Sequence, residues 1–280
     1  MPEPRRADKY RGGLLATHAL LIIGAIVMVS PYVVQILTSL KTYQETVQVP
    51  PVLWPARPQW GNYTAIFSDS FPVGRQLLNT TVAAAARAAG QILLGSMAAF
   101  AFARLEFRFR GVIFALFLSV LMVPSQLFLI PQYQVIQSLG WLDTVQALFL
   151  PGIFSAFGVF LLRQFFMTLP RELDEAARLD GCNPFQIYWH ILLPLVRPAL
   201  VALALLTVVQ SWNDLLWPLV VNSSPDQLPV SAGMANLQGQ FLDKFQLIMA
   251  AAVLTTAPII VLFAVLQRQF IAGFASSGLK

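Results

Sequence analysis

The chain is poor in the side chains that usually perform chemistry in proteins. Its 280 residues include two histidines, His18 and His190, and a single cysteine, Cys182. No pair of histidines has the spacing His-x-x-x-His, and the scattered acids do not complete a convincing zinc motif. Ser96 follows Gly95, but pairing this serine with a distant histidine has almost no sequence support. The residues therefore favour a protein that is not an enzyme and predict no metal site.

A phosphate-binding loop is also absent from the sequence. The pattern Gly-x-x-x-x-Gly-Lys-Ser/Thr, whose backbone N–H groups hold nucleotide phosphates, does not occur. We therefore expect the chain to bind no cofactor itself. An energy source such as ATP would have to act through another protein.

Two charged residues interrupt otherwise apolar stretches, where an unpaired charge is costly. Arg87 is surrounded by small residues at 83–89, which favours packing, with its side chain snorkelling or paired, over a role in lining a pathway. Asp214 follows Trp212 and Asn213 near the end of an apolar stretch. These three residues fit a polar solute path and equally a hydrated, structural position near an interface, and the sequence leaves both interpretations open.

The elements that must position these residues are apolar helices. Hydrophobic residues make up 57% of the chain and charged residues 11%, a composition outside that of ordinary soluble domains. A membrane helix needs about 20 apolar residues, and six stretches are long enough: 12–40, 77–103, 111–142, 144–162, 199–221 and 245–267. Pro124 and Pro131 are expected to break the third. The sequence predicts an all-α membrane protein with six transmembrane helices and one domain over 1–280, with a core at about 75–270.

Lysine and arginine are distributed unevenly between the predicted connecting segments, which sets the orientation. With the N-terminus in the cytoplasm, inner segments hold thirteen of them and outer segments four, namely Lys41, Arg57, Arg75 and Lys244. Both termini are therefore predicted to be cytoplasmic. This bias also explains the net charge of +5 without nucleic acid as a partner. The outer segments 41–75 and 222–246 are predicted as a short ordered loop and a longer polar loop.

The inner connection at 170–198 is too polar to cross a membrane and too regular to be unstructured. Leu173, Ala176 and Ala177 follow helical spacing and predict a first short helix, in which Glu175 can pair with Arg178. A second helix is predicted from aromatic and apolar residues at the same spacing, Phe185, Tyr188, Trp189 and Leu192, with Gly181 and Pro184 between the two helices and Pro194 and Pro198 closing the segment. Such helices lie along a surface, covered by lipid or by a partner protein.

The residues of this connection resemble the Glu-Ala-Ala loop of binding-protein-dependent ABC importer permeases. The matching residues are Glu175, Ala176, Ala177, Asp180, Gly181, Ile191, Leu193 and Pro194. Cys182 departs from the pattern, because a small residue such as alanine is common there. The segments 211–218, 228–230 and 267–270 also resemble this family. They are similar to its carbohydrate branch, specifically to the smaller maltose-type subunit.

The resemblance implies a fold, a function and partners. The 170–198 loop would be a coupling helix that docks on an ATPase, with ATP and Mg²⁺ bound by two ATPase subunits. A second, homologous permease, an extracytoplasmic solute-binding protein and a sugar or sugar derivative would complete the system, in the cytoplasmic membrane of a prokaryote. The alternative from the residues alone is an ion- or proton-driven secondary transporter, which would not need such a docking signature.

Overall fold

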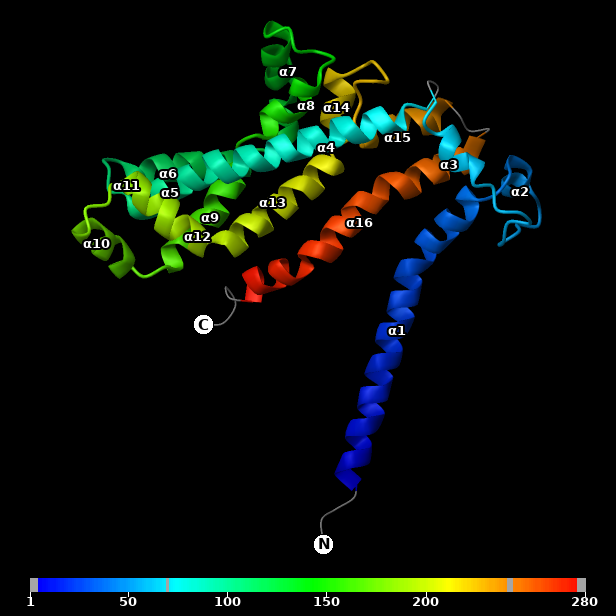
Figure 1. Cartoon of the computed structure of the whole chain (residues 1–280), viewed down its shortest axis with the longest axis horizontal. Helices are drawn as coiled ribbons and strands as arrows, with labels where there is room; N and C mark the ends of the chain where they lie inside the picture. Colours follow the sequence, from blue (N-terminus) through cyan, green and yellow to red (C-terminus); the bar gives the residue numbers. More distant parts are fainter. Residues whose placement is uncertain (1–4, 69–70, 241–243, 276–280) are drawn as a thin grey trace. The chain divides into compact units, whose positions relative to one another are not determined.

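A computed structural model describes residues 5–68, 71–240 and 244–275, and every regular element in these ranges is a helix (Figure 1). The chain divides into two compact units. Unit 1 comprises Met1–Phe71 with Leu237–Thr255, and unit 2 comprises Pro72–Asn236 with Thr256–Lys280. The all-helical class predicted from the sequence is confirmed for the described residues, whereas the single domain over 1–280 stays a prediction.

The spans correspond to three long helices and three bent helix pairs. The long helices cover Thr17–Ser39 within α1 (Arg5–Ser39), Val73–Arg104, and Phe245–Gln267 within α16 (Phe245–Ala275). The pairs are Arg110–Met122 with Ser125–Ser138, Val145–Gly152 with Ala156–Thr168, and Pro184–Leu195 with Arg197–Trp212, bent by 98°, 46° and 78°. Counting each pair once gives up to six candidate spans, the number that the sequence predicts. The last pair, however, takes in residues 184–195 of the inner connection, whereas the predicted span is 199–221.

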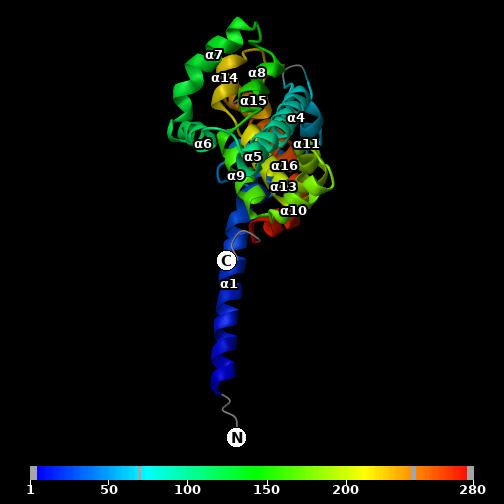
Figure 2. The same cartoon turned by 90° about the vertical axis from the view of Figure 1, so that its left-hand side faces the viewer.

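The predicted break at Pro124 is confirmed, but two other predicted details of the spans are wrong. Pro124 lies at the 98° bend between α6 (Arg110–Ser119) and α7 (Leu129–Ser138), which is visible in Figure 2. Pro131 breaks nothing, because it lies in the first turn of α7, where a proline N–H is not needed. The stretch predicted at 199–221 is also interrupted: α13 (Arg197–Trp212) ends before residues 213–215, and α14 (Leu216–Val221) follows.

In unit 1, polar contacts hold the segment after α1 in place. Thr42 and Glu45 form a capping box at the start of α2 (Tyr43–Val47). The Asn62 amide of α3 (Gly61–Ala65) donates to the carbonyl oxygens of Ser39 and Lys41 at 2.8 and 2.9 Å. Within its described residues, the predicted ordered loop at 41–75 is thus confirmed as ordered.

Unit 2 is built on the close packing of four helices. α4 (Val73–Gly90) packs along α13, and its small residues Ala83, Ala84 and Ala88 are buried. It continues through the π-helix η1 (Gln91–Gly95) into α5 (Ser96–Arg104), which packs along α9 (Ala156–Thr168) (Figure 1). Small side chains let helix backbones approach closely where lipid removes the hydrophobic driving force. The alanines around Arg87 therefore pack as the sequence predicts.

The segment 222–246 was predicted as a polar loop, but part of it is helical and buried. α15 (Val230–Gln240) begins inside it, and Leu228, Val230 and Ala232 are buried. The Asn79 amide donates to the Asp226 and Leu228 carbonyl oxygens at 2.7 and 3.1 Å. These buried contacts anchor the start of the segment to α4.

Hydrogen bonds of Asp143 connect its own turn to the turn at 221–224 in unit 2. Its φ is +58°, and its N–H donates to the Val221 carbonyl oxygen at 2.8 Å. The carboxylate accepts from the N–H groups of Ser223 and Ser224, both at 3.0 Å, and from the Ser224 hydroxyl. Partial burial raises the pKa of Asp143, but the hydrogen bonds from Ser224 and Ser223 lower it more, so the pKa lies below its ordinary value.

Replacing Asp143 with alanine should lower the free energy of unfolding by about 1–3 kcal/mol, because the amides lose their charged acceptor. A lowered folded-state pKa means that this stabilisation is present above the unfolded-state pKa and is lost as pH falls through the folded-state pKa. The difference in apparent melting temperature between wild type and Asp143→Ala should therefore be the same at pH 7 and pH 6. A difference that halves between these pH values would contradict the assignment.

Candidate functional site

The 170–198 loop forms two short helices joined by a defined turn, as predicted. α10 (Glu172–Leu179) ends in a turn where Gly181 has φ +82°, and the Cys182 and Gly181 N–H groups donate to the carbonyl oxygens of Ala177 and Arg178 at 2.9 and 3.0 Å. This double hydrogen bond is the Schellman motif, which places its left-handed residue directly after the helix cap. A glycine is needed there because a side chain resists positive φ.

The second helix runs without a break through α11 (Pro184–Gln186), the π-helix η5 (Ile187–Leu192) and α12 (Leu193–Leu195). Asn183 caps its start: its side chain accepts from the Gln186 N–H, and the Gln186 side chain accepts from the Asn183 N–H, at 2.9 and 2.8 Å. Pro184 at the first helical position needs no N–H partner. Pro194 lies inside α12 and Pro198 in the first turn of α13, on either side of a 78° bend, so the two prolines flank the end of the segment as predicted.

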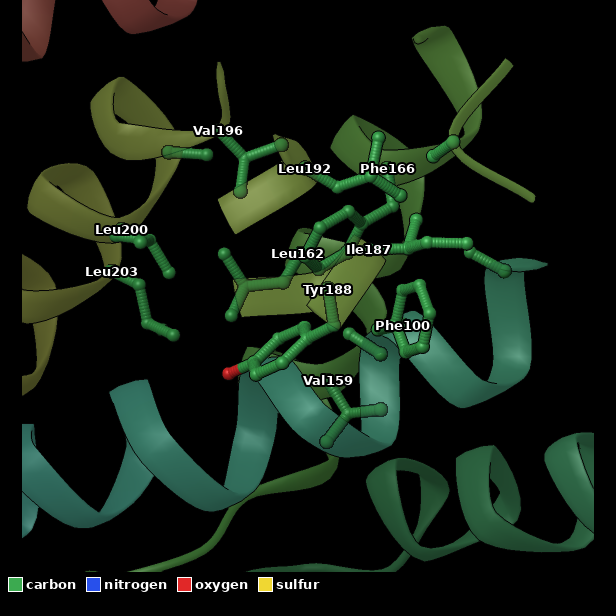
Figure 3. Packing of buried hydrophobic residues seen from close by; sticks show 14 residues of the cluster. Phe100, Val159, Leu162, Phe166, Ile187, Tyr188, Leu192, Val196, Leu200 and Leu203 are labelled. Carbon is green, nitrogen blue, oxygen red and sulfur yellow. The ribbon is translucent and has the colours of Figure 1, made fainter. Parts of the chain in front are cut away.

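The aromatic residues of the second helix do not share one face, contrary to the prediction. Tyr188 and Leu192 are buried in the core cluster that Figure 3 shows, together with residues of α5 and α9. Phe185 and Trp189 are exposed instead, with their rings stacked at 6.3 Å and 13°. The helix therefore has an inner face that packs on the spans and an outer face with two free aromatic rings.

The predicted loop residues divide between the same two sides. Ala177 is buried, and Cys182 is partly buried against the core cluster. Residues half-buried along the second helix are Ile191, Leu193 and Pro194. Residues exposed on the first helix and its turn are Glu175, Ala176, Asp180 and Gly181. Leu179 is 89% exposed beside them, so the outer side of the loop carries an apolar group that the described residues leave uncovered.

A buried ion pair fixes α10 to the end of α5. Arg104 Nη1 lies 2.9 Å from Asp174 Oδ2, and their side chains are 5% and 11% exposed. Arg104 Nη2 also donates to the Phe166 and Leu169 carbonyl oxygens at the end of α9, at 2.6 and 2.7 Å. The sequence allows Glu175 to pair with Arg178 or with a basic group of a partner, and within the described residues Glu175 makes no ion pair. Asp174 shares the buried side with Ala177 three residues on, and that spacing was the available signal.

N-terminal to Arg104, polar side chains of the continuous helix formed by α4, η1 and α5 bond to other elements of unit 2. Ser96 and Tyr188 share a hydrogen bond of 2.7 Å between α5 and the second loop helix. The Gln91 side chain donates to the Gly152 carbonyl oxygen at 2.9 Å and accepts from the Thr207 hydroxyl of α13 at 3.0 Å. We call Arg87, Gln91, Ser96 and Arg104 the polar row. Each of its side chains bonds to a different part of unit 2.

The first residue of the row pairs with the predicted pathway acid. Arg87 Nη1 lies 2.9 Å from Asp214 Oδ2, and both Arg87 Nε and Nη2 donate to the Leu148 carbonyl oxygen, Nε at 3.0 Å. Asn213 donates back to Val209 within its own helix, and Trp212 is buried. Of the three predicted pathway residues, only Asp214 therefore lines the cavity described next.

A cavity of about 350 Å³ opens beside this pair. Asp214 and Arg87 line it with Trp217 and with polar residues that sequence reasoning missed, Ser125, Gln126 and Gln132. These residues lie in the charge-free stretch 111–142, where uncharged amides in an apolar segment were the signal to follow. The cavity therefore combines an ion pair with neutral polar side chains in its wall.

Comparison with known proteins places the loop and the cavity in context. Residues 91–275 match the family described as binding-protein-dependent transport system inner membrane component. The match covers more than half of the chain and includes both the 170–198 loop and Asp214. The chain belongs to this family. The resemblance drawn from the loop residues is thereby confirmed, and the chain is a membrane protein of a transport system.

Individual relatives of this family member are transport permeases by name. It is 34% identical over 277 residues to the sn-glycerol-3-phosphate transport system permease protein UgpE of Pectobacterium atrosepticum, covering 96% of this chain and 99% of the relative. It is 39% identical over 189 residues to the arabinooligosaccharides transport system permease protein AraQ of Halalkalibacterium halodurans, covering 68% of each.

A solved structure shares the fold of this family member. The match is to a chain in the crystal structure of a bacterial ABC transporter involved in the import of the acidic polysaccharide alginate. The TM-score is 0.80 at 23% identity, and the match covers 96% of this chain and 100% of that one. The predicted permease fold is therefore confirmed.

Removing the acid of the Arg104–Asp174 pair should loosen the loop. Asp174→Ala leaves a buried arginine without its partner, and we expect a loss of about 3 kcal/mol in the free energy of unfolding. The matched control is Glu175→Ala, one residue on but exposed, which should change this energy by less than about 0.5 kcal/mol. Apparent melting temperatures and protease cleavage within 170–183 measure both. Equal effects of the two variants would contradict the structural role of Asp174.

Gly152 leaves the space that Arg87 occupies. A Cβ on Gly152 would lie 2.8 Å from both Cδ and Nε of Arg87, whereas a Cβ on Gly95 would meet nothing within 4 Å. Gly152→Ala should therefore displace the arginine and cost about 1–3 kcal/mol of unfolding free energy. Gly95→Ala, the control, should be neutral or slightly stabilising, and thermal unfolding of the purified protein in detergent distinguishes the two. Similar melting temperatures for both variants would contradict the described packing.

Proposed function

We propose that this chain is the permease subunit of an ATP-driven importer that moves a sugar or sugar derivative into the cell. Its family membership supports a transport system that depends on a binding protein. By their names, UgpE is a permease for sn-glycerol 3-phosphate and AraQ a permease for arabinooligosaccharides. They support a carbohydrate or a polyol derivative as cargo. In this proposal the chain itself catalyses no reaction.

The observation that carries the proposal is the two-sided loop at 170–198. Its inner side is tied to the spans by the Arg104–Asp174 pair and by the Tyr188 hydrogen bond. Its outer side presents Leu179, Phe185 and Trp189 without cover. Exposed aromatic and aliphatic anchors on a rigid base are typical of protein docking sites. An ATPase subunit seated on this side would move the loop and the spans together when it binds and hydrolyses ATP.

The predicted residue roles fit this docking. Glu175 and Ala176 lie on the exposed side of α10, where a charge can meet a basic group of the ATPase and a small residue permits close approach. The further partners are a second homologous permease, two ATPase subunits that bind ATP and Mg²⁺, an extracytoplasmic solute-binding protein and membrane lipid. The segment 222–246, with α15 inside it, is the proposed contact for the binding protein.

The alternative of an ion-driven carrier has little support. Proline-broken spans and a polar cavity occur in such carriers too. A secondary carrier, however, has no use for an exposed docking loop, and the family of this chain depends on a binding protein. A requirement for ATP in proteoliposomes that carry no ion gradient separates the two functions.

Gly181 and Glu175 should be needed for coupling. Gly181→Val forces a β-branched residue into φ +82°, costs about 1–2 kcal/mol in the turn and should misplace both loop helices. Glu175→Lys reverses a charge on the docking side. Both variants should retain membrane insertion, while the amount of ATPase that co-purifies falls and hydrolysis no longer drives uptake.

The matched control for the first variant is Gly111→Val, at a glycine with no positive φ and no neighbour within 4 Å. It should co-purify with the ATPase as wild type does. Wild-type ATPase retention and uptake in both loop variants would mean that residues 170–198 are only a surface loop, and the importer proposal would lose its main support.

The orientation proposed from the lysine and arginine bias has a direct test. Single cysteines at Ser223 and at Leu179, placed in a Cys182→Ser background and expressed without the ATPase, should differ in reaction with a membrane-impermeant thiol reagent. We expect labelling of Ser223→Cys from outside intact cells and of Leu179→Cys only after lysis, because short lysine- and arginine-rich loops remain in the cytoplasm. The reverse pattern would overturn the orientation with both termini inside.

A further inference from the structure

Arg110 and Arg163 lie together in unit 2 without an acidic partner. α6, which Arg110 begins, packs on α9, which contains Arg163 (Figure 2). Both residues are half-buried, and neither forms an ion pair within the described residues. Their charges are close enough to repel each other. Glu106, the acid nearest to Arg110 in the sequence, instead lines a cavity beside α10 that neither arginine lines.

Contacts within the chain fix the two guanidinium groups in this position. Arg163 Nε donates to the Phe102 carbonyl oxygen of α5 at 3.2 Å, and its guanidinium carbon lies 4.2 Å from the centre of the Phe114 ring. Arg110 Nη1 donates to the Leu105 carbonyl oxygen at 2.8 Å. Within the part of the chain that the structure describes, these are the only hydrogen bonds that the two side chains donate. Both Nη groups of Arg163 and the Nε and Nη2 groups of Arg110 therefore have donors to spare.

The depth of Arg163 indicates what could offset its charge. It lies five residues before Thr168, the last residue of α9, which is about 7 Å along the helix. The head-group layer on each side of the hydrocarbon is about 5–8 Å thick. Measured from the end of α9, Arg163 therefore lies at the level of the lipid phosphates. A charge at the edge of the hydrocarbon is costly without a group of opposite charge.

The surface next to the two arginines is apolar and faces away from the protein. Ile113 and Leu116 follow Arg110 at i+3 and i+6, and they are 45% and 66% exposed. Behind Arg163, the Phe102 and Phe114 rings pack with their centres 5.2 Å apart. Two cations followed by an exposed apolar stripe match a phosphate group followed by an acyl chain. A free phosphate ion would make no use of the stripe.

We propose that Arg110 and Arg163 form a binding site for one anionic phospholipid in the leaflet on the side of the 170–198 loop. The lipid phosphate accepts hydrogen bonds from both guanidinium groups and offsets their repulsion, because the planar guanidinium binds phosphate oxygens through paired N–H groups. One acyl chain lies along Ile113 and Leu116. The proposal goes beyond the importer function and depends neither on the cargo nor on the orientation of the chain.

The first test measures lipid affinity by native mass spectrometry of the full chain in dodecyl maltoside. The probes are palmitoyl-oleoyl phosphatidylglycerol, which is anionic, and the matching phosphatidylcholine, which is zwitterionic. We expect the anionic lipid to bind more tightly and Arg110→Gln to raise its Kd about fivefold to tenfold, the effect of losing one cation at the membrane surface. The Kd of phosphatidylcholine should not change. The matched control is Arg178→Gln, an exposed arginine of α10 that should keep the wild-type preference.

The same measurement separates a lipid from a free ion. Inorganic phosphate in the buffer should not displace phosphatidylglycerol, because the ion lacks the acyl chain that contacts the stripe. Displacement by inorganic phosphate at the concentration of the lipid would show a site for free anions and would overturn the lipid assignment. An unchanged Kd for phosphatidylglycerol in Arg110→Gln, Arg163→Gln and the control would overturn the site itself.

The second test leaves both arginines in place, because losing Arg163 also removes its contacts with Phe102 and Phe114. A fluorophore on Leu116→Cys, in a Cys182→Ser background, reports nearby doxyl-labelled lipid in phosphatidylcholine nanodiscs. Doxyl phosphatidylglycerol should reach half-maximal quenching at about a fivefold lower mole fraction than doxyl phosphatidylcholine. At Val261→Cys of α16, which is also exposed, the two lipids should quench equally. Equal quenching by both lipids at Leu116→Cys would contradict the proposal.

Discussion

Polar and charged groups inside apolar helices must find their partners within the protein, and this constraint shapes unit 2. In hydrocarbon an unpaired charge or amide is costly, so each such side chain ties its helix to another part of the chain. The polar row applies this constraint four times along one helix. Arg87 binds Asp214, Gln91 binds Gly152 and Thr207, Ser96 binds Tyr188, and Arg104 binds Asp174.

The polar row also connects the cavity to the docking loop. Its first residue lines the cavity at the helix breaks, and its last residue holds α10 of the loop. The π-helix η1 contains Gln91 of the row, and the π-helix η5 contains Tyr188, the partner of Ser96. Because the row lies on one continuous helix, a displacement of the loop by the proposed ATPase would be carried to the cavity by covalent structure and hydrogen bonds, without a separate moving part.

The sequence predicts the elements of this arrangement better than their contacts. Charge-free stretches mark the spans, and Gly181 marks the loop turn, because both features are local. The partner of Arg87 is 127 residues away and that of Arg104 is 70 residues away, and no local pattern encodes such distances. For the same reason the sequence does not distinguish Asp174 from Glu175 as the acid that pairs. It also indicates Trp212 and Asn213, rather than Gln126 and Gln132, as residues of a polar path. The interruption at 213–215 was hidden because Leu216 and Trp217 continue the apolar stretch.

The polar row implies that the 170–198 loop and α5 move as one body. Spin labels at Glu172→Cys in α10 and Met97→Cys in α5, both exposed in this chain and in a Cys182→Ser background, report the distance between them by pulsed electron resonance. The complete importer is measured without nucleotide and after trapping with ATP and vanadate. The account predicts one narrow distance distribution that is the same in both states. A distribution that broadens or shifts on trapping would show that the loop moves independently of the polar row and would contradict the account.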